Sequence, residues 1–406
     1  MKVLFTFGGL PHYYNKVLNK LQQEPDLDIV VLAPEQNQQT LGAGVKQAED
    51  GLLFRVIRLP EYNTWYGKAF FRNLSELIDI EKPDIVVTVW PYVLGFIYFP
   101  LLWLKLKRKG IRLIFKDIPF MLPARKEANA YYKNPDVLRV NEDYVIPELG
   151  VLYGLKIQFL TFSRRLYYGL LADAHVHYIE GAAPLVATYG AKPESVFVTY
   201  NSPDTDELFE ARAYIADLPT ILPPNPHRIL HVGRLVKWKR VDLLIDALAR
   251  ILPSIPDAEL VVIGTGPEMT TLQDQAKRLD IERHVKFVGG VYKLTDLGRY
   301  LNESALYVLA GMGGLSINEA MAFGKPVVCS VCDGTEKHLV REGINGRYFT
   351  HGDVVSLAEV INDIITDPLT LTQMGEASTA IIRDEIHIGT VIDGYKKAFQ
   401  YVIKLG

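Results

Sequence analysis

Cysteine is nearly absent from this sequence, which excludes a disulfide scaffold. The 406 residues include two cysteines, Cys329 and Cys332, and two thiols cannot cross-link a chain of this length. Their C-x-x-C spacing occurs in zinc and redox sites, but a structural zinc site needs four ligands and the sequence has no second pair. We therefore interpret both as structural thiols.

The sequence also lacks a strong excess of charge. Its net charge is −3, which argues against a protein that binds nucleic acid by neutralising phosphates over a whole face. The first seven residues have the length of one strand and run into glycines, without the length or cleavage site of a signal peptide. We expect a cytoplasmic protein.

One long run has no charge. It extends from Ile85 to Leu104 and is followed by four cations, Lys105, Lys107, Arg108 and Lys109. Its length meets the requirement for a membrane span, but Pro91, Gly95 and Pro100 interrupt it. We predict a buried strand, a turn and a helix whose exposed side carries the lysines. As an alternative, the basic and aromatic segment 93–109 lies on the inner face of a membrane and meets a lipid-linked acceptor there.

Short runs rich in Val and Ile recur every 25 to 40 residues, with amphipathic helical stretches between them. This alternation predicts βαβ units and parallel sheets. The expected strands are 2–7, 29–33, 53–58, 84–89, 112–116, 174–179 and 196–200, then 228–233, 259–263, 284–288, 305–309 and 326–330.

A proline cluster at 223–226 separates the two halves, because consecutive prolines cannot join a helix or a central strand. We expect an N-terminal lobe at 1–208, a linker at 209–227, a C-terminal lobe at 228–385 and a helical tail at 386–406 that packs on one of the lobes. Ligands of doubly wound lobes bind at the carboxyl ends of the strands. The expected site is therefore the cleft between the lobes.

Two cations follow the first strand of the C-terminal lobe. After Gly233 come Arg234 and then Lys239, just before a helix that begins near Val241. The positive end of a helix and the planar fork of an arginine both suit phosphate. The alternative is that both are solvated loop charges.

Glycine turns follow the next two strands. They contain Gly264 and Gly266 after strand 259–263, and Gly290 with Val291 after strand 284–288. Glycine lets the backbone approach a base or a phosphate closely. Such a turn is weak evidence alone, because turns need glycine anyway.

The strongest pattern is the glycine-rich segment 310–328. A strand leads into Gly311, Gly313 and Gly314, and a short helix then begins near Leu315 and Ser316. The loop and the first helical turn present N–H groups suited to a diphosphate. Glu319 follows about 5.4 Å further along the helix axis on the same side as Ser316, where a carboxylate can accept from ribose hydroxyls. Alternatively, Glu319 is an ordinary exposed helix residue.

These segments resemble the retaining glycosyltransferases of the GT-B fold that carry an E-x7-E motif (glycosyltransferase family 4-like, group 1). The resemblance covers about residues 170–370 and implies an α/β protein of two Rossmann-like, doubly wound parallel-sheet lobes. It implies that Arg234 and Lys239 bind the donor diphosphate and that Glu319 binds the ribose. Gly290 and Val291 would border the base, and Gly313–Ser316 would contact sugar and phosphate. In the first lobe, Gly8 and Gly9 match the glycine loop that faces the reaction centre.

Two departures from the family pattern affect the sugar end of the site. The first acidic residue of the motif is replaced by Gly311, so sugar recognition must differ. The first lobe has Lys116 and Asp117 where the family often has a histidine. Asp117 and His12 are the candidates for a catalytic role there, and either is also explained as a polar loop residue.

The resemblance implies transfer of a sugar from a nucleoside diphosphate sugar to an acceptor hydroxyl of a glycan or lipid-linked saccharide, with retention of configuration. Preorganised cations stabilise the leaving group, so we expect no metal, no other cofactor and no nucleic-acid partner. The alternatives are a sugar-nucleotide epimerase and a sugar-nucleotide-binding protein without catalysis. A dehydrogenase is disfavoured, because the first turn lacks G-x-G-x-x-G. Residues 119–168, rich in Tyr and Arg, are expected to shape the acceptor side.

Overall fold

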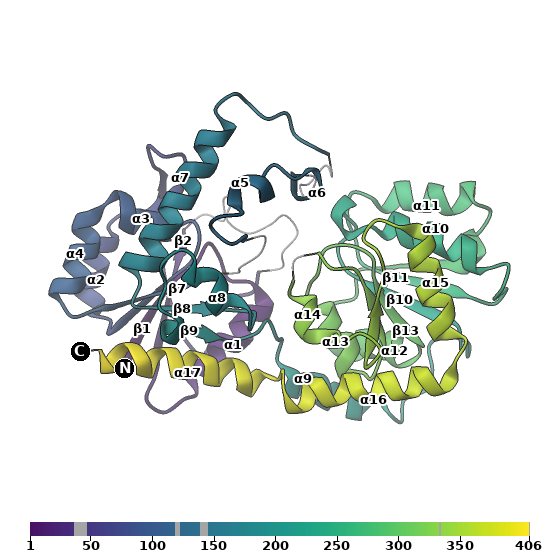
Figure 1. The fold of residues 1–406 in the computed structure, drawn as a ribbon. Coiled ribbons are helices and arrows are strands. Elements are labelled where there is room, and N and C mark those ends of the chain that lie inside the picture. Colours follow the sequence, from purple (N-terminus) through teal and green to yellow (C-terminus); the bar gives the residue numbers. More distant parts are fainter. Residues whose placement is uncertain (36–46, 118–121, 139–144, 333, 406) are drawn as a thin grey trace. The chain divides into compact units, whose positions relative to one another are not determined.

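The computed structural model describes residues 1–35, 47–117, 122–138, 145–332 and 334–405 (Figure 1). The chain divides into two compact units. Unit 1 comprises Met1–Val137, Pro147–Asn201 and Gly389–Gly406, and unit 2 comprises Leu138–Ile146 and Ser202–Ile388. Each unit contains one main parallel sheet.

The sheet of unit 1 has seven parallel strands in the order β3-β2-β1-β6-β7-β8-β9. They are β1 (Lys2–Thr6), β2 (Asp28–Pro34), β3 (Arg55–Leu59), β6 (Ile85–Thr88), β7 (Arg112–Lys116), β8 (Ala174–His177) and β9 (Val196–Val198). All seven were predicted from their apolar runs, and the five inner strands are largely buried, as is typical of a parallel sheet covered on both faces. The antiparallel hairpin of β4 (Glu61–Asn63) and β5 (Ala69–Phe71) was not predicted from the sequence.

The sheet of unit 2 has six parallel strands in the order β12-β11-β10-β13-β14-β15. They are β10 (Arg228–Val232), β11 (Glu259–Ile263), β12 (Val285–Gly289), β13 (Leu306–Leu309), β14 (Val327–Cys329) and β15 (Gly346–Tyr348). Strand order reverses between β10 and β13, and in doubly wound sheets ligands bind at the carboxyl ends of the strands at such a point. Together with unit 1, this arrangement confirms the predicted α/β fold class.

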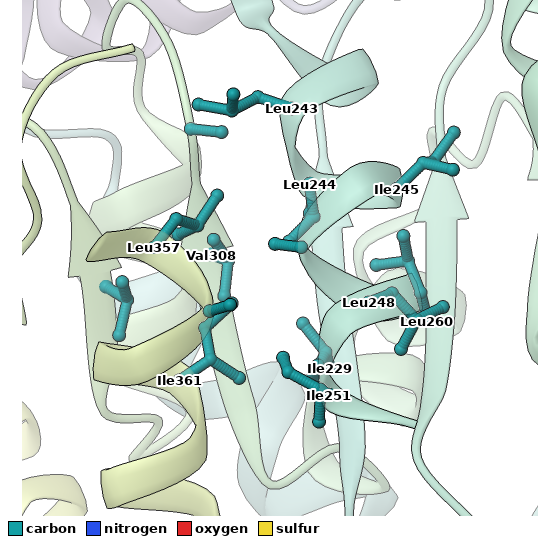
Figure 2. Close-up of a cluster of buried hydrophobic side chains, with 14 of the residues drawn as sticks. Ile229, Leu243, Leu244, Ile245, Leu248, Ile251, Leu260, Val308, Leu357 and Ile361 are labelled. Atoms are coloured by element: carbon teal, nitrogen blue, oxygen red, sulfur yellow. The ribbon is translucent and has the colours of Figure 1, made fainter. Parts of the chain in front are cut away.

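The core of unit 2 explains why its helices form where they do. Helix α10 (Val241–Ile251) buries apolar residues three and four apart, which is the spacing of a helix face. Figure 2 shows Ile251 of α10 near Ile229 of β10, and both belong with Leu244 and with Ile361 of α15 (Val354–Ile365) to one buried cluster. Helices α11 (Met269–Arg278), α12 (Leu294–Asn302) and α16 (Pro368–Asp384) belong to the same unit.

The boundary between the units differs from the expected one. The main segment of unit 2 begins at Ser202, and helix α9 (Thr205–Ile215) occupies much of the segment expected to close the first lobe and begin the linker. The Asp204 carboxylate caps this helix by accepting from Asp206 N at 3.2 Å. Leu208, Ala211 and Ile215 are buried, and α9 packs on α12 and α13 (Ser316–Ala322). The proline cluster 223–226 lies between α9 and β10, inside unit 2.

The C-terminal helix α17 (Ile388–Lys404) belongs almost entirely to unit 1. Its Tyr395 ring lies 6.0 Å from that of Phe5 on β1, and Lys396 Nζ pairs with Glu24 at 2.5 Å. At Gly394 a Cβ would overlap the carbonyl oxygen of Val198. This glycine therefore lets the helix lie directly against the edge strand β9.

The uncharged run resolves into β6, α3 (Val93–Tyr98) and α4 (Pro100–Arg108). The predicted strand is present, and the structure has two short helices where one was predicted, the second of which carries the lysines. Among the described residues, no helix is both long and apolar enough to cross a membrane. Three cations that follow the run are paired. Lys105 and Lys109 reach Asp79 at 2.5 and 2.8 Å, and Lys107 reaches Asp173 at 2.5 Å. Segment 93–109 therefore presents less unneutralised positive charge than its sequence indicates.

Candidate functional site

Two loops at the carboxyl edge of the unit 2 sheet are joined by hydrogen bonds. One follows β10 and contains Arg234 and Lys239, and the other follows β13 and contains the three glycines. Met312 N donates to Trp238 O at 2.9 Å. Lys239 Nζ donates to Met312 O at 2.7 Å and to Gly313 O at 2.6 Å. The cation and the glycine loop predicted separately thus form one constellation.

Lys239 is held firmly in place. Only 8% of its surface is exposed, and a Cβ at Gly314 would come within 3.3 Å of its Nζ. Arg234 is half-buried, and its guanidinium lies 5.6 Å from the Trp238 ring centroid, a cation–π arrangement. Trp238 was missed by sequence reasoning, although it lies one residue before Lys239.

Gly311 lies where the family that this sequence resembles has its first acidic residue, and the structure shows why this position is a glycine. A Cβ there would overlap the carbonyl oxygen of Trp238 and approach the carbonyl carbon of Lys239 to 2.6 Å. The two loops pack backbone against backbone at this point. No side chain fits at Gly311, so the carboxylate of the family motif has no equivalent here.

Ser316 and Glu319 lie on the first turns of α13. Tyr307 from β13 donates its hydroxyl proton to Ser316 Oγ at 2.7 Å. Burial raises the Tyr307 pKa, and the charge of Glu319 raises it further, so the phenol stays protonated and remains a donor. Because Ser316 Oγ accepts from Tyr307, its own proton can be directed to a ligand. Tyr307 was not singled out from sequence, where it is one residue of an apolar strand.

Gly264 and Gly266 bring neighbouring loops together. Gly264 has φ +145°, and a Cβ there would overlap Gly233 O, as one at Gly266 would overlap Leu235 O. Leu235 N donates to Thr265 O at 2.9 Å. Both glycines therefore support the loop that carries Arg234. Their predicted contact with a donor stays a prediction.

Gly290 and Val291 follow β12, at the edge of the sheet. A Cβ at Gly290 would come within 2.9 Å of the Tyr292 ring. The strands β11 and β10 separate this position from the α13 side of the constellation. These two residues thus mark the opposite side of the same carboxyl edge.

His231 is a site neighbour that the sequence did not reveal. It is fully buried on β10, and Nδ1 lies 3.1 Å from Val308 O. Because a carbonyl only accepts, Nδ1 carries the proton and Nε2 is an acceptor. Burial lowers the pKa of His231 to about 4, so the ring is neutral. Nε2 would lie 3.4 Å from a Cβ at Gly233. Gly233 directly precedes Arg234, so the ring lies next to the loop that carries Arg234 and Lys239.

In unit 1 the predicted residues also lie at one sheet edge. Gly8 and Gly9 follow β1, Asp117 follows β7, and His12 is exposed at the start of α1 (His12–Gln22). Asp117 accepts a hydrogen bond from the Tyr168 hydroxyl. The structure thus gives Asp117 a fixed partner, which the sequence could not indicate.

Lys116 is the unexpected group of unit 1. Its ammonium donates to Tyr178 OH at 2.8 Å and lies 4.8 Å from the Tyr14 ring centroid. Burial lowers the pKa of Lys116 to about 7, although Asp117 opposes the shift. The side chain is almost completely enclosed, so it sets the electrostatics around Asp117 rather than reaching a ligand.

Neither the two thiols nor the potential metal-binding side chains of the described residues form a second site. Cys329 is buried and Cys332 is half-buried, and the Cys332 Sγ lies 3.4 Å from His351 Nδ1. Among the described residues, no group of three or more His, Cys, Asp or Glu side chains is placed to hold a metal ion.

Residues 219–380 match the family model of Glycosyl transferases group 1. An uncharacterised glycosyltransferase of Haemophilus influenzae is 30% identical over 191 residues, 45% of this chain and 53% of that protein. An N-acetyl-alpha-D-glucosaminyl L-malate synthase of Bacillus anthracis is 26% identical over 43% of this chain and 46% of that protein. The chain thus spans about half the length of the curated relatives it matches.

Two solved structures are similar over nearly the whole chain. Anabaena HepE in complex with UDP has a TM-score of 0.67 at 19% identity, covering 98% of this chain and 100% of that chain. Sucrose-phosphate synthase of Thermosynechococcus elongatus has a TM-score of 0.69 at 15% identity, covering 100% of both chains. The fold is therefore shared well beyond the segment in which the sequences match.

Proposed function

We propose that this chain, which has the GT-B fold and carries a group 1 glycosyltransferase domain at residues 219–380, is a glycosyltransferase. It transfers a sugar from a nucleoside diphosphate sugar to an acceptor hydroxyl, with retention of configuration. One observation carries the proposal. Lys239 is fixed between the two loops that leave β10 and β13, where doubly wound sheets bind their ligands.

The donor is held by its diphosphate and its ribose. Arg234 and Lys239 supply positive charge beside the loop Gly313–Ser316, whose N–H groups and Ser316 hydroxyl can donate to phosphate oxygens. Glu319 accepts from the ribose hydroxyls. As the glycosyl–phosphate bond breaks, negative charge grows on the leaving diphosphate. Preorganised cations and N–H dipoles stabilise that charge without reorganisation, and the mechanism calls for no metal.

The acceptor is a hydroxyl of a glycan or a lipid-linked saccharide, and unit 1 binds the acceptor. Asp117 and His12 are the groups proposed to act beside the anomeric carbon. Asp117 is oriented by Tyr168, and the buried Lys116 next to it adds positive charge when protonated. A carboxylate in this position can act as a general base that accepts a proton from the acceptor hydroxyl.

The first experiment identifies the donor and then tests the site. Thermal shift against UDP-, GDP- and ADP-sugars selects the nucleotide. Turnover of the selected donor is then measured in Lys239→Ala and in Lys237→Ala, a matched control in the same turn whose lysine is exposed. We expect Lys239→Ala to lower kcat/KM at least about tenfold and Lys237→Ala to leave it within about twofold. Equal kinetics in the two variants would remove Lys239 from the site.

A second candidate function rests on Gly311. Because no carboxylate can stand at this position, the alternative is a protein that binds a sugar nucleotide without transferring the sugar. The product formed from donor and a panel of saccharide acceptors separates the two. Binding of the donor with no new glycoside for any acceptor supports the second candidate, and an epimerised sugar from donor alone supports an epimerase.

A further inference from the structure

Helix α7 (Tyr153–Leu166) contributes little to the core of unit 1. Of its fourteen residues, Ile157 and Ser163 are the buried ones. Four large apolar side chains recur three and four residues apart on another side, and each is more than half exposed: Leu152, Leu155, Phe159 and Phe162. We call these four residues the α7 stripe. Their spacing gives one continuous apolar face, which no described part of the chain covers.

Aromatic rings extend the α7 stripe sideways. The Tyr98 ring at the end of α3 lies 6.3 Å from Phe159, 4.1 Å from Tyr66 and 5.0 Å from Trp65. Trp65, in the turn between β4 and β5, is 76% exposed. Leu149 and Val151, just before α7, are also exposed. The apolar surface thus spans three segments of unit 1 and is larger than a single exposed side chain would explain.

The charges around this surface are mostly positive, with Glu148 beside Leu149 as an exposed exception. The sequence of α7 contains Lys156, Arg164 and Arg165 and no acidic residue, and Lys156 and Arg165 are exposed. Exposed Lys68 lies in the same hairpin turn as Trp65. On α4, in contrast, Lys105 and Lys107 are paired with Asp79 and Asp173, and Arg108 is the exposed cation of that helix. More positive charge is therefore available to a partner beside the α7 stripe than on segment 93–109.

We propose that the α7 stripe, with Trp65 and Tyr98 at its side, docks unit 1 on a lipid bilayer that carries anionic headgroups. Apolar side chains of a helix lying in the bilayer plane enter the acyl boundary, while Lys and Arg stay with the headgroups. Trp and Tyr are the residues that favour this interface. A second copy of the chain fits less well, because two such faces would bring like charges together.

Vesicle binding tests the proposal without any sugar nucleotide, so the result is independent of the glycosyltransferase activity. The protein is sedimented with vesicles of phosphatidylcholine and phosphatidylglycerol and with vesicles of phosphatidylcholine alone. We expect binding to the anionic vesicles, weakened by salt. The variant Leu155→Gln/Phe162→Gln should bind at least about tenfold more weakly. Its matched control is Val355→Gln/Leu369→Gln, which changes two exposed apolar residues of unit 2 and should bind like wild type.

A second pair of variants tests the charge. Lys156→Glu/Arg165→Glu should lose the preference for anionic vesicles while retaining the wild-type thermal unfolding midpoint. The proposal is overturned if wild type binds neither vesicle, or if the stripe variant binds as well as its control. It is also overturned if light scattering finds a dimer that Leu155→Gln/Phe162→Gln dissociates, because a second copy then covers the stripe.

Discussion

The carboxyl edges of the two sheets are formed by different groups, backbone in unit 2 and tyrosine side chains in unit 1. In unit 2, backbone meets backbone at Gly311 and Gly264, and a single ammonium, Lys239, joins the loops. In unit 1, tyrosine side chains fill the same kind of edge and enclose Lys116 and Asp117. An edge made of glycine and backbone has a fixed shape that tolerates no added atom. The shape and the charge of an edge made of tyrosines depend on whether its buried groups, such as Lys116, hold a proton.

The largest effect should come from filling the glycine contact in unit 2. Gly311→Ala places a methyl group against Trp238 O, where backbone would have to move. We expect a loss of about 3 kcal/mol in the free energy of unfolding, together with loss of turnover. Gly290→Ala is the control, since its methyl group meets the movable ring of Tyr292 and should cost under about 1 kcal/mol. Urea unfolding measures both, and equal losses would contradict the backbone contact.

The next effect concerns two lysines whose pKa values are lowered, one in each unit: Lys116 is buried and Lys325 is half-buried. Burial lowers the pKa of Lys116 to about 7 and that of Lys325 in unit 2 to about 8. Between the folded value and 10.5 the unfolded chain binds the extra proton, so stability rises with pH in that window. From pH 7 to 9, Lys116 should add about 2 kcal/mol and Lys325 about 1 kcal/mol.

The slope of unfolding free energy against pH measures this difference. Lys116→Met should flatten the slope between pH 7 and 9 more than Lys325→Met does. The stability at any single pH is not the readout, because Lys325 Nζ also donates to Asn302 O and Ser304 O and its removal leaves those carbonyls unpaired. If both variants keep the wild-type slope, the two lysines do not titrate in this range.

Acid should weaken unit 1 more than unit 2. Burial lowers the pKa of His175 to about 4 and of His177 to about 3, and in unit 2 it lowers that of His231 to about 4. The unfolded chain takes up protons below about pH 6.5 while these folded rings stay neutral, so stability is lost as pH falls. From pH 7 to 5.5 each ring should remove about 1 kcal/mol. In His177→Leu the number of protons taken up on unfolding at pH 5.5 should fall by about one, measured as a smaller slope of unfolding free energy against pH.

The smallest effect should come from the one phenol that acts in the glycine-built edge. Tyr307→Phe removes the donor to Ser316 Oγ but leaves the ring in place, so we expect a fall of about fivefold in kcat/KM with little change in stability. Tyr348→Phe removes a comparable phenol of the same unit, which donates to Val340 O at 2.7 Å. Its kinetics should match wild type, and an equal fall in both variants would indicate general loosening of unit 2.

The same contrast explains what the sequence could predict. Apolar runs predicted all seven strands of the unit 1 sheet and five of the six in unit 2, while β15, with three residues and a glycine, gave no such run. Glycines mark the unit 2 edge in the sequence itself, so Lys239 and the loop at 311–316 were singled out as a candidate site, and the structure brings them together. His231, Tyr307 and Lys116 were missed because each looks like part of a buried strand. The partners of His231 and Lys116, Val308 and Tyr178, lie far away in the chain, as do the two residues that meet at the contact between Gly311 and Trp238.

Helix α17 makes unit 1 discontinuous along the sequence. A fragment that stops at Asn201 lacks Tyr395 and Phe399, two buried rings that pack on Phe5. Such a fragment would expose the apolar face of the sheet that these rings cover. In protein engineering, residues 202–388 are therefore the natural exchangeable insert. A hybrid that replaces this segment keeps both ends of unit 1 from one parent, whereas a single crossover after residue 201 forces β1 and α17 from different parents to fit each other.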